Sequence, residues 1–107
     1  MGLDRITAVI TALQRAGIRA ERSFPVGVMP YLTGPVAAVG LERVQVESVT
    51  VAVRIYSPMD LGGQKCEDTA ILAAKTLAAM GGAYQVTGCT FDSRMGVFTM
   101  LVVATFL

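Results

Sequence analysis

The sequence has no histidine and no tryptophan among its 107 residues. The lack of histidine excludes mechanisms in which imidazole acts as a base, orients a nucleophile or binds a metal. Cysteine is scarce too: Cys66 and Cys89 do not form a CxxC pair, and without histidine they make no zinc site. We expect one on a helix and the other on a strand, which favours two buried thiols over one disulfide. We therefore expect no metal, no cofactor and no enzymatic activity.

Charged side chains are few, at 16% of the residues against roughly 25% in an average soluble domain. Nine Lys and Arg against eight Asp and Glu leave a net charge of +1, which is too small for the positive field that nucleic-acid-binding proteins carry. Hydrophobic residues make up 53%, and the mean hydropathy is +0.58. Because a domain of this length buries only about 60–70% of its unfolded surface, we expect part of the apolar surface to lie against other subunits.

One uncharged run, residues 23–41, has the length of a membrane span. Pro25, Pro30 and Pro35 interrupt it every five residues, which excludes a helix in lipid. The first ten residues carry charges where the apolar part of a signal peptide would begin. We therefore expect a soluble protein that makes no contact with membranes.

Hydrophobic periodicity predicts one α+β domain over residues 1–107, in which two helices pack on a largely antiparallel sheet. Helices are expected over residues 3–16, ended by Gly17, and 64–80, ended by Gly81 and Gly82. The expected strands are 18–24, 36–44, 49 to the stop at Pro58, 84–91 and 97–106. The order is thus α-β-β-β-α-β-β. A change of phase near Glu47 and Ser48 predicts a turn or bulge there.

The strand over residues 97–106 is apolar on both faces. Such a strand is covered on both sides, and we expect the helices on one side and a neighbouring subunit on the other.

The segment 25–35 is too rich in proline and glycine for a regular strand, so it is predicted to be a loop or an extended arm. It nevertheless carries Val28, Met29 and Tyr31. If these side chains are exposed, they form an apolar patch that packs on a partner. The alternative is an arm folded onto its own core.

Seven of the nine basic residues are arginines, the residue type favoured in ion pairs across interfaces. Arg19 and Arg22, with Glu21 between them, lie beside the segment 25–35 and are candidates for a subunit seam. Arg54 is opposite in phase to Val53 and Ile55, so it belongs to the other face of its strand. The alternative is that these arginines only keep the surface soluble.

Taken in order, the segments resemble the tail terminator, or tail-completion, proteins of long-tailed bacteriophages and prophages. The resemblance covers nearly the whole chain in topology. Its pieces are the amphipathic first helix, the approach FPVGVMPYLTGPVAAVGL, the strand VTVAVRIYSP, the helix CEDTAILAAKTLAAM and the terminal hairpin CTFDSRMGVFTMLVVATFL. Between Val39 and Val49 the chain is shorter than many such proteins.

This resemblance implies a structural protein of the virion tail or neck, assembled in the cytoplasm of the bacterial host. The family forms a ring, commonly a hexamer, that sits on the last layer of the tail tube, stops its growth and faces the head connector. In contractile tails the end of the tail sheath is a further partner. From position and chemistry we place the partner contacts in the segment 25–32, at Met59 and Leu61, and at Arg94 in the turn 92–96.

Other functions stay open at this point. The chain is alternatively another component of a phage tail or injection system, such as a connector or a tail chaperone. It is also compatible with a small-ligand-binding dimer built on a ferredoxin-like sheet. A further alternative is an enzyme whose site forms between subunits from Arg54, Asp60 and Cys66.

Overall fold

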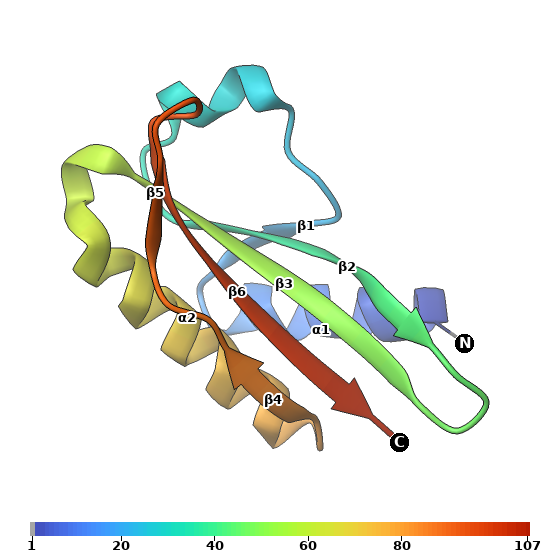
Figure 1. Ribbon diagram of the computed structural model, residues 1–107. Coiled ribbons are helices and arrows are strands. Elements are labelled where there is room, and N and C mark those ends of the chain that lie inside the picture. Colours follow the sequence, from blue (N-terminus) through green and yellow to red (C-terminus); the bar gives the residue numbers. More distant parts are fainter. Residues whose placement is uncertain (1) are drawn as a thin grey trace.

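The computed structural model describes residues 2–107, with side chains from Asp4 onward. One sheet carries both helices on the same face, while short 3₁₀ helices lie at one end of the strands (Figure 1). The elements in chain order are α1 (Gly2–Arg15), β1 (Arg19–Glu21), η1 (Val26–Tyr31), β2 (Val36–Val44), β3 (Val49–Pro58), η2 (Met59–Leu61), α2 (Gly62–Ala79), β4 (Ala83–Val86), β5 (Thr90–Asp92) and β6 (Val97–Phe106). Within this described part, neither α1 nor α2 has the length and apolar character needed to cross a bilayer.

The strands follow the order β1-β2-β3-β6-β4, and β5 pairs with the other half of β6. The central pair is β3 and β6, which are hydrogen-bonded in antiparallel register from Val49 opposite Phe106 to Pro58 opposite Val97. Only β1 and β2 pair in parallel among the described strands. The predicted α+β fold with a largely antiparallel sheet is therefore confirmed.

The hydrophobic core lies between the helices and one face of the sheet. Alternate residues of β3 point into it, since Val51, Val53 and Ile55 are fully buried while Arg54 is exposed on the opposite face. The helices contribute side chains at helical spacing, namely Ile6, Val9 and Leu13 from α1 and Cys66, Ala70, Ala73, Ala74 and Leu77 from α2. Four alanine and cysteine positions on α2 keep that helix close to the strands, as its narrow apolar stripe predicts.

Both helices end in the same way. The amide of Ile18 donates to the Leu13 carbonyl at 3.0 Å, and the amide of Gly82 donates to the Leu77 carbonyl at 2.9 Å. Gly17 and Gly81 both have φ of +91°, the left-handed conformation that glycine adopts without a steric cost. The predicted helix ends are thus correct to within two residues.

The turn predicted near Glu47 and Ser48 is confirmed, and the hairpin between β2 and β3 has a further irregularity at Glu42, between Leu41 and Arg43. Two other expectations need correction. The first strand is only three residues long. The strand expected over residues 84–91 is two strands, β4 and β5, because the Leu101 amide donates to the Thr87 hydroxyl at 3.0 Å and the ladder breaks there.

Candidate interaction surfaces

Within the segment 25–35, residues Val26–Tyr31 form a short 3₁₀ helix, η1, where a loop or extended arm was predicted. Its i→i+3 hydrogen bonds include the Val28 amide to the Pro25 carbonyl at 3.1 Å. A 3₁₀ turn needs few amide donors, so it accommodates a segment in which Pro30 has none. Tyr31 and Val26 point outward, with 81% and 70% of their surfaces exposed.

Met29 was expected to contact a partner, and this expectation is wrong. Its side chain is only 3% exposed and lies beside Pro58 and Gly96, so it packs on its own chain. Val36 is paired with Tyr56 and Val97 with Pro58, so both valines lie on the sheet face opposite the helices. Both are buried as well. η1 therefore covers one end of the sheet face that the helices leave bare, with Met29 as its anchor.

The structure brings three of the predicted contact segments together at one end of the molecule, which we call the arm end: η1, η2 and the turn 92–96 (Figure 1). A shallow hollow of about 340 Å³ lies among them. Met59 and Leu61 are exposed beside it, and Asp60 lines it. In the turn, the Asp92 carboxylate accepts hydrogen bonds from the amides of Arg94 and Met95 at 2.9 and 3.1 Å, which fixes the position of the exposed Arg94.

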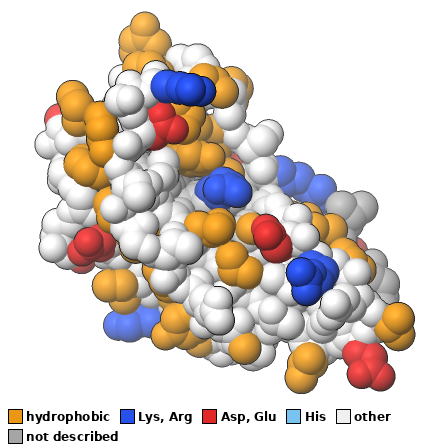
Figure 2. Space-filling view, viewed as in Figure 1, with side chains coloured by type: hydrophobic (Ala, Val, Ile, Leu, Met, Phe, Trp, Pro, Cys, Tyr) orange, Lys and Arg blue, Asp and Glu red, His pale blue; other side chains and the backbone are white. Residues whose placement is uncertain are grey.

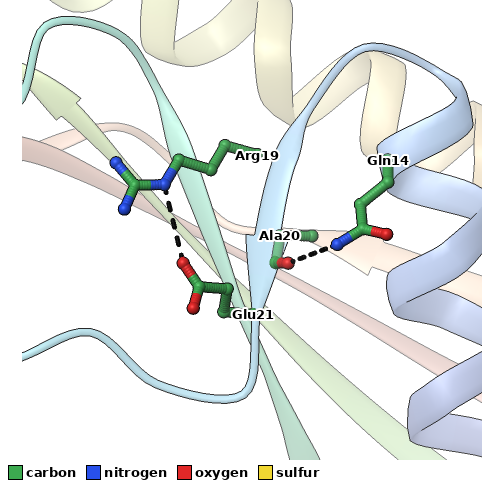
Figure 3. A network of polar contacts seen from close by, with 4 residues as sticks. All are labelled: Gln14, Arg19, Ala20 and Glu21. Atoms are coloured by element: carbon green, nitrogen blue, oxygen red, sulfur yellow. Dashed lines mark hydrogen bonds and ion pairs between the residues drawn. The ribbon is translucent and has the colours of Figure 1, made fainter.

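Arg19 and Arg22, the candidates for a subunit seam, both contact other residues of their own chain. Arg19 Nε lies 3.5 Å from Glu21 Oε2, and the Gln14 side chain donates to the Ala20 carbonyl at 3.1 Å (Figure 3). Arg22 donates to the Thr7 hydroxyl of α1 at 3.4 Å. Because the ion pair is exposed, it adds at most about 1 kcal/mol to the stability. Arg22 thus links the edge of the sheet to α1, whereas Arg19 pairs within β1. Both side chains remain accessible to a partner.

Arg54 stands at the centre of the bare face, on the middle strand of the sheet. Its neighbours in register are Ala38 on β2 and Leu101 on β6. Among the described residues it makes no hydrogen bond or ion pair. On one side a hollow of about 520 Å³ is lined by Tyr56 and by the hydroxyl-bearing residues Thr87, Thr90 and Thr99. Arg54 is thus a charge on an open sheet that its own chain leaves unpaired.

The three residues considered for an enzyme site lie apart within one subunit. Asp60 is at the arm end, Arg54 is on the bare face, and Cys66 is buried between α2 and the opposite face of the sheet. One hollow is lined by both Arg54 and Tyr56, but Asp60 does not line it.

The two cysteines are free thiols that lie side by side. Burial, together with the neighbouring Cys89 thiol, raises the pKa of the Cys66 thiol from its ordinary value of 9.0 to about 12. Cys66 therefore stays protonated near neutral pH and has little nucleophilic character. Cys89 was expected on a strand, and this expectation is wrong, because the residue is half-buried in the loop between β4 and β5.

Two exposed apolar residues on α2 were not predicted as contact residues from the sequence. Ile71 and Leu72 are 49% and 41% exposed on the outer side of the helix. The signal was available, because both lie off the stripe formed by Cys66, Ala70, Ala73 and Leu77. Apolar residues outside a core-facing stripe indicate a second contact surface.

No protein-family model, no curated protein and no solved structure matches this chain.

Proposed function

We propose that the chain is a structural subunit of a bacteriophage or prophage tail, a ring-forming terminator or neck subunit that caps the tail tube and joins it to the head connector. The observation that carries this proposal is the arm end. Tyr31, Val26 and Met59 together expose apolar surface at one end of an elongated molecule measuring 41 × 23 × 23 Å. Contact with the last layer of the tube, or with the connector, removes that surface from water.

The composition of the arm end fits a protein interface. Tyr and Met are enriched at the centres of interfaces, and a rim of charged residues is typical around them. Asp60 and Arg94 provide charges of both signs beside the apolar side chains. The role requires no cofactor, no acid–base chemistry and no nucleic-acid contact, and in a contractile tail the sheath end is an additional partner.

The experiment uses the purified tail-tube protein of the same phage or prophage, polymerised in the presence of the chain. We expect tubes to stop lengthening and to carry a cap at one end in electron micrographs. Tyr31→Asp is expected to abolish capping without changing the melting temperature. Val46→Asp, at the fully exposed tip of the β2–β3 hairpin, is the matched control and is expected to cap normally. Tubes that lengthen unchanged beside the unaltered chain contradict the proposal.

A second candidate, a small-ligand-binding protein, is favoured by the hollow next to Arg54. A guanidinium group, the Tyr56 hydroxyl and three threonine residues suit a carboxylate or phosphate. Native mass spectra of the protein purified from its host are expected to retain a bound anionic compound if this candidate is right. Arg54→Ala is then expected to lose it. A spectrum of ligand-free protein argues against this function.

A further inference from the structure

One face of the sheet is bare. Both helices pack on the other face, and η1 covers only the end of the bare one (Figure 1). The strands lie in front of α1 in that view, so Figure 2 shows the bare face, where single basic and acidic side chains stand among hydrophobic and neutral ones. Ala52, Leu101 and Val103 on this face are only half-buried. A sheet with apolar residues on both faces is normally covered on both.

The bare face is broad enough to seat a helix. Its long strands β2, β3 and β6 lie about 4.8 Å apart and run for nine or ten residues at about 3.3 Å each, so they span roughly 14 × 32 Å, or about 450 Å². A helix with its side chains is about 10 Å across. The part of the face that η1 leaves open can therefore seat one helix of another subunit.

Arg54 makes a symmetric sheet-to-sheet dimer unfavourable. It lies near the middle of the central strand, so a two-fold axis through the face brings two Arg54 side chains together. Like charges next to each other in an interface oppose association. Glu42 lines a hollow on this face together with Arg54, but no ion pair joins the two side chains among the described residues. The face instead favours a partner that brings a carboxylate and apolar side chains.

The outer side of α2 has this combination. Glu67 and Asp68 come one helical turn before the exposed Ile71 and Leu72. Asp68 accepts a hydrogen bond from Gln64 within the helix at 2.9 Å, while Glu67 makes none within the described chain. Its carboxylate is therefore available to a cation of another molecule.

The spacing of these groups matches the sheet. Residues four apart on a helix, such as Glu67 and Ile71, are separated by about 6 Å along its axis. On the bare face, Arg54 lies opposite Leu101, and Val103 follows about 6.6 Å further along β6. A carboxylate placed on Arg54 thus positions the apolar pair of α2 near Val103 and Ala52, which face each other in register.

We infer that the bare face of the sheet is the seat of helix α2 of a second copy of this chain, with Glu67 on Arg54 and Ile71 on the half-buried apolar residues. This inference rests on the proposed ring and names its subunit contact. Because the two surfaces differ and lie on opposite sides of one chain, the contact repeats from copy to copy and closes into a ring when the rotation permits. The result is a sheet with helices on both faces.

Charge exchange tests the contact. Arg54→Glu and the double variant Glu67→Arg/Asp68→Arg are each expected to raise the protein concentration for half-assembly at least tenfold in sedimentation velocity. Combining all three substitutions is expected to restore assembly. Arg15→Glu, the same charge change on the exposed side of α1, is the control and is expected to assemble like the unaltered chain. Circular dichroism melting verifies that each variant is folded.

Site-specific cross-linking distinguishes this contact from a symmetric one. A short bismaleimide is added to Ala52→Cys and Ile71→Cys, alone and mixed, with the unaltered chain reporting any reaction of Cys89. We expect a cross-linked dimer only in the mixture. Three results overturn the inference: efficient cross-linking of Ala52→Cys alone, full assembly of Arg54→Glu, or an unaltered chain that stays monomeric. Tube capping by such a monomer leaves the capping role standing and refutes the ring with its subunit contact, whereas assembly without capping refutes the capping role alone.

Discussion

Helices α1 and α2 lie on the same face of the sheet and end in the same glycine cap, yet their outer sides differ. α1 presents Asp4, Thr7, Gln14 and Arg15 to solvent, and none of its described large apolar side chains is exposed. α2 presents Ile71 and Leu72. An amphipathic helix that also has apolar residues on its solvent side keeps apolar surface in contact with water when the subunit is alone. This difference in exposed apolar surface supports the proposed contact between α2 and a second copy of the chain.

The largest expected effects show what the two helices have in common. Leu13 of α1 and Leu77 of α2 are fully buried at equivalent places near the helix ends. Replacing either with alanine leaves a cavity and is expected to cost about 2–5 kcal/mol in the free energy of unfolding. Urea denaturation measures this cost. A much smaller loss for one helix means that its inner side is not part of the core.

Substitutions on the outer sides are expected to separate the helices. Ile71→Glu leaves the free energy of unfolding of the monomer within about 0.5 kcal/mol, because its side chain is half-exposed. Assembly, followed by sedimentation velocity, is expected to be lost. Ala8→Glu on the exposed side of α1 is the matched control, expected to change neither quantity. Equal loss of assembly in both variants removes the distinction between the helices.

The inner side of α2 is expected to make stability depend on alkaline pH. Because the pKa of the Cys66 thiol is about 12 in the folded protein and 9.0 is its ordinary value, the folded state favours the protonated thiol. This stabilisation is fully present below about pH 9 and is lost as the pH rises towards 12. Urea denaturation of the unaltered chain and of Cys66→Ala between pH 8 and pH 10.5 measures it, and the variant is expected to show the weaker decline above pH 9. Parallel declines contradict this assignment.

The smallest expected effect concerns the attachment of α1 to the edge of the sheet. Arg22 donates to the Thr7 hydroxyl at 3.4 Å, and this hydrogen bond is exposed to water. Arg22→Ala is therefore expected to lower the free energy of unfolding by about 0.5 kcal/mol or less. Thermal unfolding followed by circular dichroism measures the change. A loss above 2 kcal/mol means that Arg22 has a larger structural role than this single contact.

Much of the fold follows from local patterns in the sequence. The spacing of Ile6, Val9 and Leu13 predicts α1, and the phase of Arg54 against Val53 and Ile55 places it correctly on the other face. The break between β4 and β5 is different in kind, because it depends on a hydrogen bond from Leu101 to the Thr87 side chain across the sheet. The apolar pattern along one strand does not show that a side-chain hydroxyl, instead of a backbone carbonyl, accepts the hydrogen bond of the neighbouring strand.

The candidate surfaces were predictable only in part. The sequence marks Met29 and Tyr31 as apolar residues in an irregular segment, but it does not say which points inward. That choice is set by the rotation of η1 above Pro58, so Met29 is buried and Tyr31 is 81% exposed. The bare sheet face was expected from the apolar character of β6 on both sides. The proposed contact of this face with α2 could not be predicted from the sequence, because it depends on where both surfaces lie in three dimensions.

The place of β6 has a consequence for biosynthesis. This strand comes last in order among those described, yet it joins β3 to both β4 and β5 in the middle of the sheet. The nascent chain therefore cannot complete its sheet until residues 97–106 have left the ribosome. Before that moment β3 has an unprotected edge, which is prone to pairing with other chains.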